Sequence, residues 1–210
     1  MNDAELLKTH TIKWLIKGHL GFNKARDAIA TEVLFSKNRR KADLLILSNI
    51  SYTLEIKSDA DDLRKLKLQL RDYCNTFDKV SIITTSKYVD SINRMINRNT
   101  GLILFNNNNF KIIKHAKLNK RLNKHSLLMF LPKTELIRLG KFVGVRRLST
   151  DEIRNILSHR MSTCITRKLV LSFLKKRYLT LFRLLLKDTE GKIVWDDLRG
   201  LCGNFDKLYA

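Results

Sequence analysis

Hydrophobic and polar residues alternate with different spacings along the first 115 residues, and each spacing predicts an element. Residues 3–17 have a helical spacing, and Gly18 and Gly21 follow them. The helix has five residues near one face: Leu6, Leu7, His10, Trp14 and Leu15. The mostly apolar stretch Ala28–Phe35 predicts a strand with Glu32 inside it. That carboxylate needs a partner if it is buried, or it lies on the exposed face of an edge strand.

The next stretch predicts a hairpin that carries charged residues. Leu44–Leu47 is a short apolar run, and Tyr52–Lys57 alternates between apolar and polar residues. Glu55 and Lys57 therefore point to the same face of their strand. If the hairpin is centred on Asn49, Asp43 lies directly opposite Glu55. Two carboxylates and one ammonium on one face can hold Mg²⁺ and act on a phosphate, or they form a solvated surface group.

The following segment favours a site over a solvated group. Acidic residues in the stretch Asp59–Asp62 predict the start of a helix. A helical stripe toward the sheet follows at Leu63, Leu66, Leu70 and Cys74. Gln69 and Tyr73 are four residues apart beside that stripe, so both can lean toward the strand end that carries Glu55.

These residues together resemble a known signature. Asp43 followed by Glu55-Ile56-Lys57 is similar to the motif of the PD-(D/E)XK nuclease superfamily, and Gln69-x-x-x-Tyr73 is similar to the additional Q-x-x-x-Y motif of its exonuclease-like branches. Several segments over residues 1–115 also resemble an uncharacterised bacterial sce-type family within this superfamily. They are Arg40-Lys-Ala-Asp-Leu, Glu55-Ile-Lys-Ser-Asp, Asp62-Leu-Arg-Lys-Leu and Phe77-Asp-Lys-Val. The family usually has Arg-Val/Ala-Asp where this chain has Lys41-Ala-Asp43, and a proline between the leucine and the glutamine where this chain has Lys67-Leu68. Neither departure affects a catalytic position.

The resemblance implies a role for each residue of the site. Asp43 and Glu55 are expected to bind Mg²⁺ or Mn²⁺, and Glu32 matches the first-motif glutamate that completes or supports the metal shell. Lys57 is expected to act on the nucleophilic water and on the transition-state charge. The catalytic set also includes two residues that orient the site or contact the substrate backbone: Gln69 and Tyr73.

Later elements complete an α/β fold. Val80–Thr84 predicts a strand and Ser86–Asn97 a helix, and Gly101–Phe105 pairs with Phe110–Lys114 across a turn of four asparagines. The order α-β-β-β-α-β matches the minimal core of the PD-(D/E)XK (restriction-endonuclease-like) fold, with a mixed sheet and helices on both sides. We expect a nuclease-like core over residues 1–115.

Residues 116–210 form a second, basic and mainly helical region. Four cations suggest an exposed basic helix or a linker: Lys117, Lys120, Arg121 and Lys124. Ser149 and Glu152 have the spacing of a capping box, which begins a helix to about Arg160. A long helix then runs from about Ser162 to Lys187, and the segment after Gly191 packs back as a small tail. This region is either a helical cap with solvated charges or a module that grips nucleic acid.

The net charge of +21 changes the functional interpretation most. Residues 111–210 carry 23 Lys and Arg against 8 Asp and Glu, so the excess lies in the second half. A polyanion is the natural partner because Lys and Arg release counterions from phosphates, and an anionic membrane surface is the rival partner. Phosphate contacts are expected from two basic runs: Lys37, Arg39, Arg40 and Lys41 before Asp43, and Lys175, Lys176 and Arg177 in the long helix. The first run could also be only a solvated turn.

Other classes of protein lack support in the sequence. There is no stretch of 18 apolar residues, no signal peptide at the start, and no glycine-rich nucleotide-binding loop. The three cysteines suit a reducing cytoplasm, and no His or Cys spacing indicates zinc. We therefore predict a cytoplasmic, Mg²⁺- or Mn²⁺-dependent nuclease that acts on nucleic acid, with DNA the expected substrate. The alternative is a non-catalytic nucleic-acid-binding protein of phage or defence origin that retains the nuclease fold.

Overall fold

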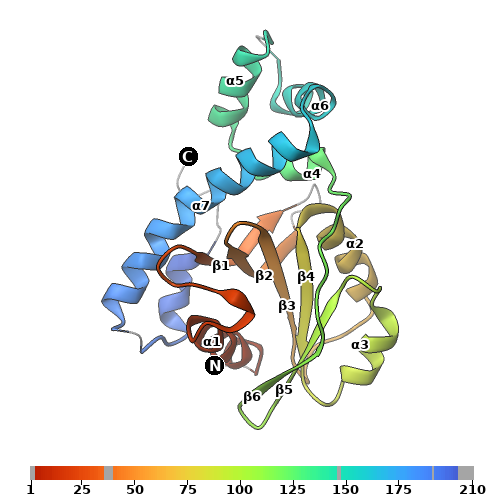
Figure 1. Ribbon diagram of the computed structural model, residues 1–210, viewed down its shortest axis with the longest axis vertical. Coiled ribbons are helices and arrows are strands. Elements are labelled where there is room, and N and C mark those ends of the chain that lie inside the picture. Colours follow the sequence, from red (N-terminus) through yellow and green to blue (C-terminus); the bar gives the residue numbers. More distant parts are fainter. Residues whose placement is uncertain (1–2, 36–39, 146–147, 191, 203–210) are drawn as a thin grey trace.

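The computed structural model describes residues 3–35, 40–145, 148–190 and 192–202, and it shows an α/β fold built on a mixed six-stranded sheet (Figure 1). The first half contains α1 (Asp3–Ile16), η1 (His19–Gly21), β1 (Ala28–Phe35), β2 (Arg40–Leu47), β3 (Ser51–Lys57), α2 (Leu66–Thr76), β4 (Lys79–Thr84), α3 (Val89–Met95), β5 (Gly101–Asn106) and β6 (Asn109–Lys114). The second half contains α4 (Lys124–Leu128), α5 (Lys133–Phe142), α6 (Thr150–Arg160), α7 (Thr163–Asp188) and η2 (Asp196–Leu201).

The six strands lie side by side in chain order, from β1 to β6. β1–β2, β2–β3 and β5–β6 pair antiparallel, whereas β3–β4 and β4–β5 pair parallel through the crossover helices α2 and α3. Every residue of β3 is buried, so this strand is covered on both faces. The predicted order α-β-β-β-α-β and the mixed sheet are confirmed.

The predicted hairpin register is also confirmed. Leu44 pairs with Leu54 and Leu47 with Ser51, which centres the hairpin on Asn49. Two hydrophobic runs of this length leave only one register that keeps both apolar faces buried, because a slip by one residue turns every side chain over. This register places the first half of β2, which carries Asp43, beside the charged end of β3.

The expected start of a helix at Asp59–Asp62 is wrong, because α2 begins at Leu66. The Asp61 carboxylate accepts hydrogen bonds from the backbone nitrogen of Ser58 at 2.7 Å and from its hydroxyl at 2.6 Å. The Asp62 carboxylate accepts one from the backbone nitrogen of Arg64 at 2.8 Å. These short acidic side chains therefore stabilise local turns, which compete with helix capping for the same residues.

The buried face of α1 differs in part from the predicted one. Leu7 and Leu15 are buried as expected, but Leu6 is 40% exposed. Trp14 stacks on Phe110 of β6 with the ring centroids 4.6 Å apart. The helix thus contacts the β5–β6 hairpin on one side, and its other side faces the first strands and buries Lys8.

The second half packs on the sheet mainly through α7, which lies against β1. Ser149 and Glu152 form the predicted capping box of α6, and Ser162 caps α7. The buried residues of α7 join the core of the first half: Val170, Leu174, Tyr178, Phe182 and Leu185. Lys117, Lys120 and Arg121 lie in an extended linker, not in a helix, and Lys124 begins α4. The tail packs back as predicted, with Leu198 and Leu201 buried.

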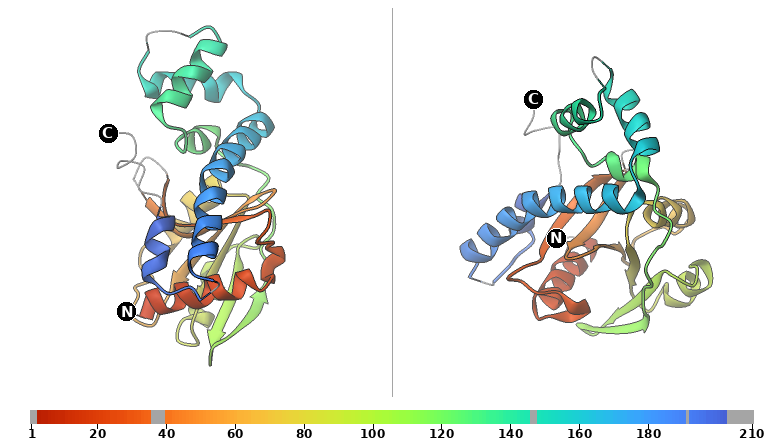
Figure 2. Two further views of the ribbon diagram at one scale, coloured as in Figure 1. Left: turned by 90° about the vertical axis from the view of Figure 1, so that its left-hand side faces the viewer. Right: turned by 45° about the horizontal axis from the view of Figure 1, so that its top comes forward.

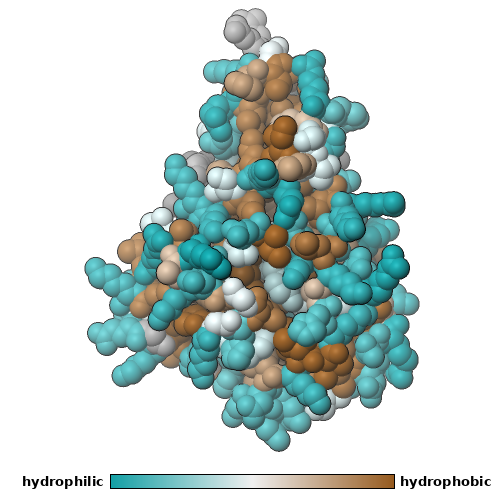
Figure 3. Space-filling model, viewed as in Figure 1, coloured by the Kyte–Doolittle hydropathy of each residue, from teal (hydrophilic) through white to brown (hydrophobic). Residues whose placement is uncertain are grey.

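The helices α5 and α6 stand away from the sheet, at the N-terminal end of α7 (Figures 1 and 2). Apolar side chains gather on this part of the molecule among the hydrophilic ones that cover most of the face in Figure 3. In the described ranges, no helix has both the length and the apolar character needed to cross a membrane.

Candidate active site

Three carboxylates form a row across the first three strands. The pairs Thr31–Leu44 and Val33–Ala42 flank Glu32 and Asp43, so these two acids lie opposite each other on β1 and β2. The register of β2 and β3 continues the row from Asp43 to Glu55. The predicted proximity of the three acids is therefore what the strand pairing produces.

Glu55 is the most enclosed of these acids, with 3% of its side chain exposed. The Lys57 ammonium lies 2.8 Å from its Oε1 atom, as expected for neighbours on one strand face. The Tyr73 hydroxyl of α2 donates a hydrogen bond to its Oε2 atom and also lies 3.0 Å from the backbone oxygen of Lys41. Both oxygens of Glu55 are thus held by protein donors.

Asp43 is fixed from two directions. Its Oδ2 atom accepts a hydrogen bond from the backbone nitrogen of Ile56 at 2.8 Å, which ties β2 to β3 beyond their last ladder pair. Its Oδ1 atom lies 2.8 Å from the ammonium of Lys8 on α1. The carboxylate therefore cannot turn without breaking a charged contact.

Lys8 is a residue of the site that sequence reasoning missed. Its ammonium also contacts Glu32, so a single cation bridges the first two acids of the row. The sequence offered one signal: a lysine between apolar residues on the buried side of α1. A buried charge needs a partner, so this lysine indicated an acidic residue nearby. The stripe through His10 and Trp14 pointed instead to the other side of the helix.

The acids and cations of this cluster shift one another's pKa. Burial and the negative charge of Asp43 raise the pKa of Glu55 from 4.5 to about 7, although Lys57 and Tyr73 act in the opposite direction. Burial lowers the pKa of Lys57, but the charge and hydrogen bond of Glu55, together with the charges of Asp43 and Asp61, outweigh burial and raise it. For Lys8 the carboxylates of Asp43 and Glu32 likewise outweigh burial and raise the pKa. Both lysines therefore stay cationic at neutral pH.

The Tyr73 phenol is held in its neutral form. Burial and the charge of Glu55 both raise its pKa above the ordinary value of 10.0. Its ring stacks on Phe35 with the centroids 4.9 Å apart, which fixes the direction of the hydroxyl. Tyr73 is thus a permanent hydrogen-bond donor to Glu55, and its orienting role in catalysis stays a prediction.

Glu32 has an unusual backbone for a strand residue, with φ at 51°. A non-glycine residue in the left-handed region is strained by roughly 1–2 kcal/mol, and such residues persist where the surrounding structure holds them. The contact with Lys8 and the β1–β2 pairs on either side provide that support. The strain lies at the carboxylate that the sequence singled out.

The other predicted residues of the first half lie around the cluster with different surroundings. Gln69 is half-buried on α2, and within the described residues its side chain makes no hydrogen bond. Arg40 pairs with Asp72 of α2. The Lys41 ammonium is half-exposed and lies 3.8 Å from Glu32. Two further predicted residues, Lys37 and Arg39, lie outside the described residues.

The predicted basic run on α7 is not uniform. The Lys175 ammonium donates to the backbone oxygen of Ser48 at 3.3 Å and lies 3.8 Å from Asp27, so it fastens α7 to the sheet. The Arg177 guanidinium lies over the Tyr178 ring at 5.7 Å. Lys176 is exposed. This helix is thus part of the core, and phosphate contacts from Lys176 and Arg177 stay a prediction.

The donor chemistry of the row suits a hard divalent cation, since Mg²⁺ and Mn²⁺ prefer carboxylate oxygens. The repulsion between Asp43 and Glu55, visible in the raised pKa of Glu55, would also be relieved by such an ion. Over the described ranges, however, no three His, Cys, Asp or Glu side chains converge closely enough to hold a metal ion. Lys8 already lies between Glu32 and Asp43. An ion held by Asp43 and Glu55 would have to replace some of the contacts that Lys8, Lys57 and Tyr73 make with these carboxylates.

Comparisons with known proteins place the chain in a family. A solved structure of a protein of unknown function from Silicibacter pomeroyi is similar with a TM-score of 0.45 and 12% identity, over 68% of this chain and 92% of that one. Protein cII of Enterobacteria phage P4 is 32% identical over 188 residues, which cover 83% of this chain and 69% of that protein. Residues 2–202 match the family described as bacteriophage P4 protein cII. The chain therefore belongs to the bacteriophage P4 protein cII family.

Proposed function

We propose that this chain is a PD-(D/E)XK-type nuclease that hydrolyses phosphodiester bonds with Mg²⁺ or Mn²⁺, and that DNA is its substrate. The observation that carries the proposal is the buried contact between Lys57 and Glu55, with Asp43 opposite Glu55 on the next strand. In the proposed fold, α1, β1, β2, β3, α2 and β4 are the αβββαβ core. The three free cysteines, Cys74, Cys164 and Cys202, suit a cytoplasmic enzyme.

Asp43 and Glu55 would hold the metal ion, which supplies a Lewis acid and a more acidic bound water when present. Lys57 would orient the attacking water and offset the charge that develops on the phosphate. Tyr73 would keep the Glu55 carboxylate in one orientation through its hydroxyl. The backbone nitrogen of Ile56 does the same for Asp43.

Lys8 would serve as a fixed counter-ion for Glu32 and Asp43. With its ammonium between them, the site carries fewer unpaired negative charges than three bare carboxylates. A phosphate group therefore meets less repulsion on approach, and Lys41 at the half-exposed rim adds a cation that can contact it.

The test is an incubation of the purified chain with linear DNA, closed circular DNA and RNA, each with Mg²⁺, Mn²⁺ or EDTA. We expect cleavage of DNA with either metal and none with EDTA. Cleavage of the circle indicates an endonuclease, and cleavage of linear DNA alone indicates action at ends. Cleavage that persists in EDTA would contradict the proposal.

One observation favours a second candidate, a nucleic-acid-binding protein without catalysis. The Lys8 ammonium offsets one of the two negative charges of Glu32 and Asp43 without any metal ion, and a binding protein with this fold would need such an offset where phosphate approaches. In the same assay, tight DNA binding with no cleavage under any metal condition identifies this candidate.

A further inference from the structure

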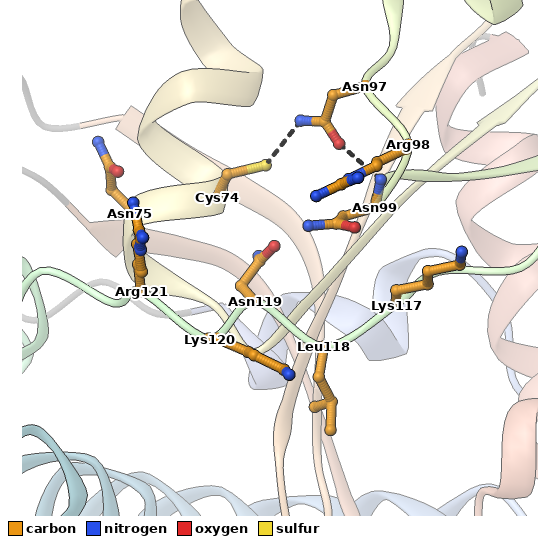
Figure 4. A pocket seen from close by; sticks show the side chains of 10 residues that line it. All are labelled: Cys74, Asn75, Asn97, Arg98, Asn99, Lys117, Leu118, Asn119, Lys120 and Arg121. Atoms are coloured by element: carbon orange, nitrogen blue, oxygen red, sulfur yellow. Dashed lines mark hydrogen bonds between the residues drawn. The ribbon is translucent and has the colours of Figure 1, made fainter.

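A basic hollow lies on the far side of α2 from the carboxylate row. Its volume is about 760 Å³, and its walls come from the end of α2, the turn before β5 and the linker after β6 (Figure 4). Four of its side chains are asparagines and none is acidic. Four more are cationic: Arg98, Lys117, Lys120 and Arg121.

A second hollow of about 290 Å³ adjoins the first and shares three lining residues with it. It adds two cations from α2, Lys67 and Arg71, and again no acid. We call the two hollows the basic groove. Arg71 and Tyr73 are two positions apart on α2, so their side chains leave the helix in nearly opposite directions. The basic groove is therefore separate from the cluster around Glu55.

The six cations of the basic groove have no acidic partner within the part of the chain that the structure describes. Lys67 and Arg71 are like charges at i and i+4, an arrangement that destabilises a helix by roughly 0.2–0.5 kcal/mol. Some cations elsewhere pair at close range, as for Arg40 with Asp72 and Arg167 with Asp78. The groove is thus left with a concentrated positive charge that only an external anion can offset.

The frame that carries these cations is fixed by hydrogen bonds. The backbone nitrogen of Asn119 donates to the backbone oxygen of Asp78 at 2.8 Å, and its side-chain amide donates to the backbone oxygen of Phe77 at 2.8 Å. The backbone nitrogen of Lys117 donates to Asn99 at 2.9 Å. A linker held in this way presents its charges in one arrangement, which lowers the entropy lost when a ligand binds.

We propose that the basic groove binds the phosphate backbone of a nucleic-acid strand. Neighbouring cations and asparagine amides are the groups that contact phosphate and sugar oxygens. The walls contain no aromatic side chain for base stacking, so contact with the backbone is favoured over base recognition. The inference rests on the nucleic-acid partner of the proposed function. It assigns to this groove the binding of the part of the substrate that lies outside the carboxylate row.

The test compares two double variants that remove equal charge. Arg98→Ala/Arg121→Ala alters the groove, and Lys111→Ala/Lys192→Ala removes two exposed cations elsewhere. Binding of a fluorescein-labelled oligonucleotide is measured by anisotropy in EDTA, over about 50–200 mM salt. The slope of log affinity against log salt is negative. If the groove contacts phosphates, this slope should become less steep by about 1.4 for a single strand or about 1.8 for a duplex. The control variant should keep the slope of the parent.

A second groove variant, Lys117→Ala/Lys120→Ala, controls for misfolding of the first and should make the slope less steep by the same amount. Equal slopes for the groove and control variants would overturn the proposal, as would a parent that binds no nucleic acid at low salt. Because binding is measured in EDTA, the result does not depend on cleavage. If the parent binds through the groove and never cuts, only the nuclease proposal is refuted. If the parent cuts and every variant keeps the slope of the parent, only the proposal for the groove is refuted.

Discussion

The substitution Glu55→Gln should change how the stability of the metal-free protein depends on pH. The pKa of Glu55 is raised from 4.5 to about 7 by burial and by the charge of Asp43. Between these two values the folded state binds a proton that the unfolded state has released, so stability falls as the pH rises through this window. A difference of this size corresponds to about 3 kcal/mol, which is a large part of the stability of an ordinary domain.

The assay is urea unfolding of parent and variant in EDTA at intervals from about pH 4.5 to pH 8. Glutamine cannot ionise, so the Glu55→Gln variant should lack the decline of about 3 kcal/mol that the parent shows. If Asp43 and Glu55 hold Mg²⁺ as proposed, saturating Mg²⁺ favours the ionised form of Glu55. Added Mg²⁺ should therefore remove most of the decline in the parent and have little effect in the variant.

Glu135→Gln is the matched control, because that glutamate lies on the surface of α5 and pairs with Arg138. Its profile should follow that of the parent. Parallel profiles for the parent and Glu55→Gln would show that Glu55 has the same affinity for protons in the folded and unfolded states, against the expectation from its burial.

Three further variants test other parts of the structure by urea unfolding. Lys8→Met leaves Glu32 and Asp43 facing each other without their shared cation, so we expect a loss of about 3–5 kcal/mol in EDTA and a partial recovery with Mg²⁺. Phe182→Ala removes a fully buried ring from α7, and a loss of about 3–5 kcal/mol would show that α7 belongs to the core, whereas a loss below about 1 kcal/mol would contradict this. Ser149→Ala breaks the capping box of α6 and should cost about 1 kcal/mol.

Much of the fold and the centre of the site could be predicted because strand periodicity is strict. A side-chain period of 2 and a buried apolar face allow one register for β2 and β3, and that register brings Asp43 beside Glu55. The contact between Tyr73 and Glu55 followed from the resemblance and from the helical stripe of α2.

What could not be predicted depends on tertiary contacts. Lys8 joins the site because α1 turns a polar residue toward the sheet while its aromatic residues pack on β6. The Asp61 carboxylate accepts a hydrogen bond from the backbone nitrogen of Ser58, three residues earlier, and no local rule decides between that turn and a helix cap. Lys175 looked like a phosphate ligand in a basic run, yet it reaches Ser48 and Asp27 because α7 lies across β1.

Single-turnover cleavage by the parent and by Lys57→Ala shows whether the cluster of Asp43, Glu55 and Lys57 cuts DNA. The protein is kept in excess over end-labelled linear DNA with Mg²⁺, and DNA affinity is measured in parallel with EDTA. We predict that Lys57→Ala lowers the cleavage rate by roughly 10²–10³, equivalent to about 3–4 kcal/mol, while affinity changes little because one of 41 cations is lost. Equal cleavage rates for parent and variant would show that this cluster is not the active site.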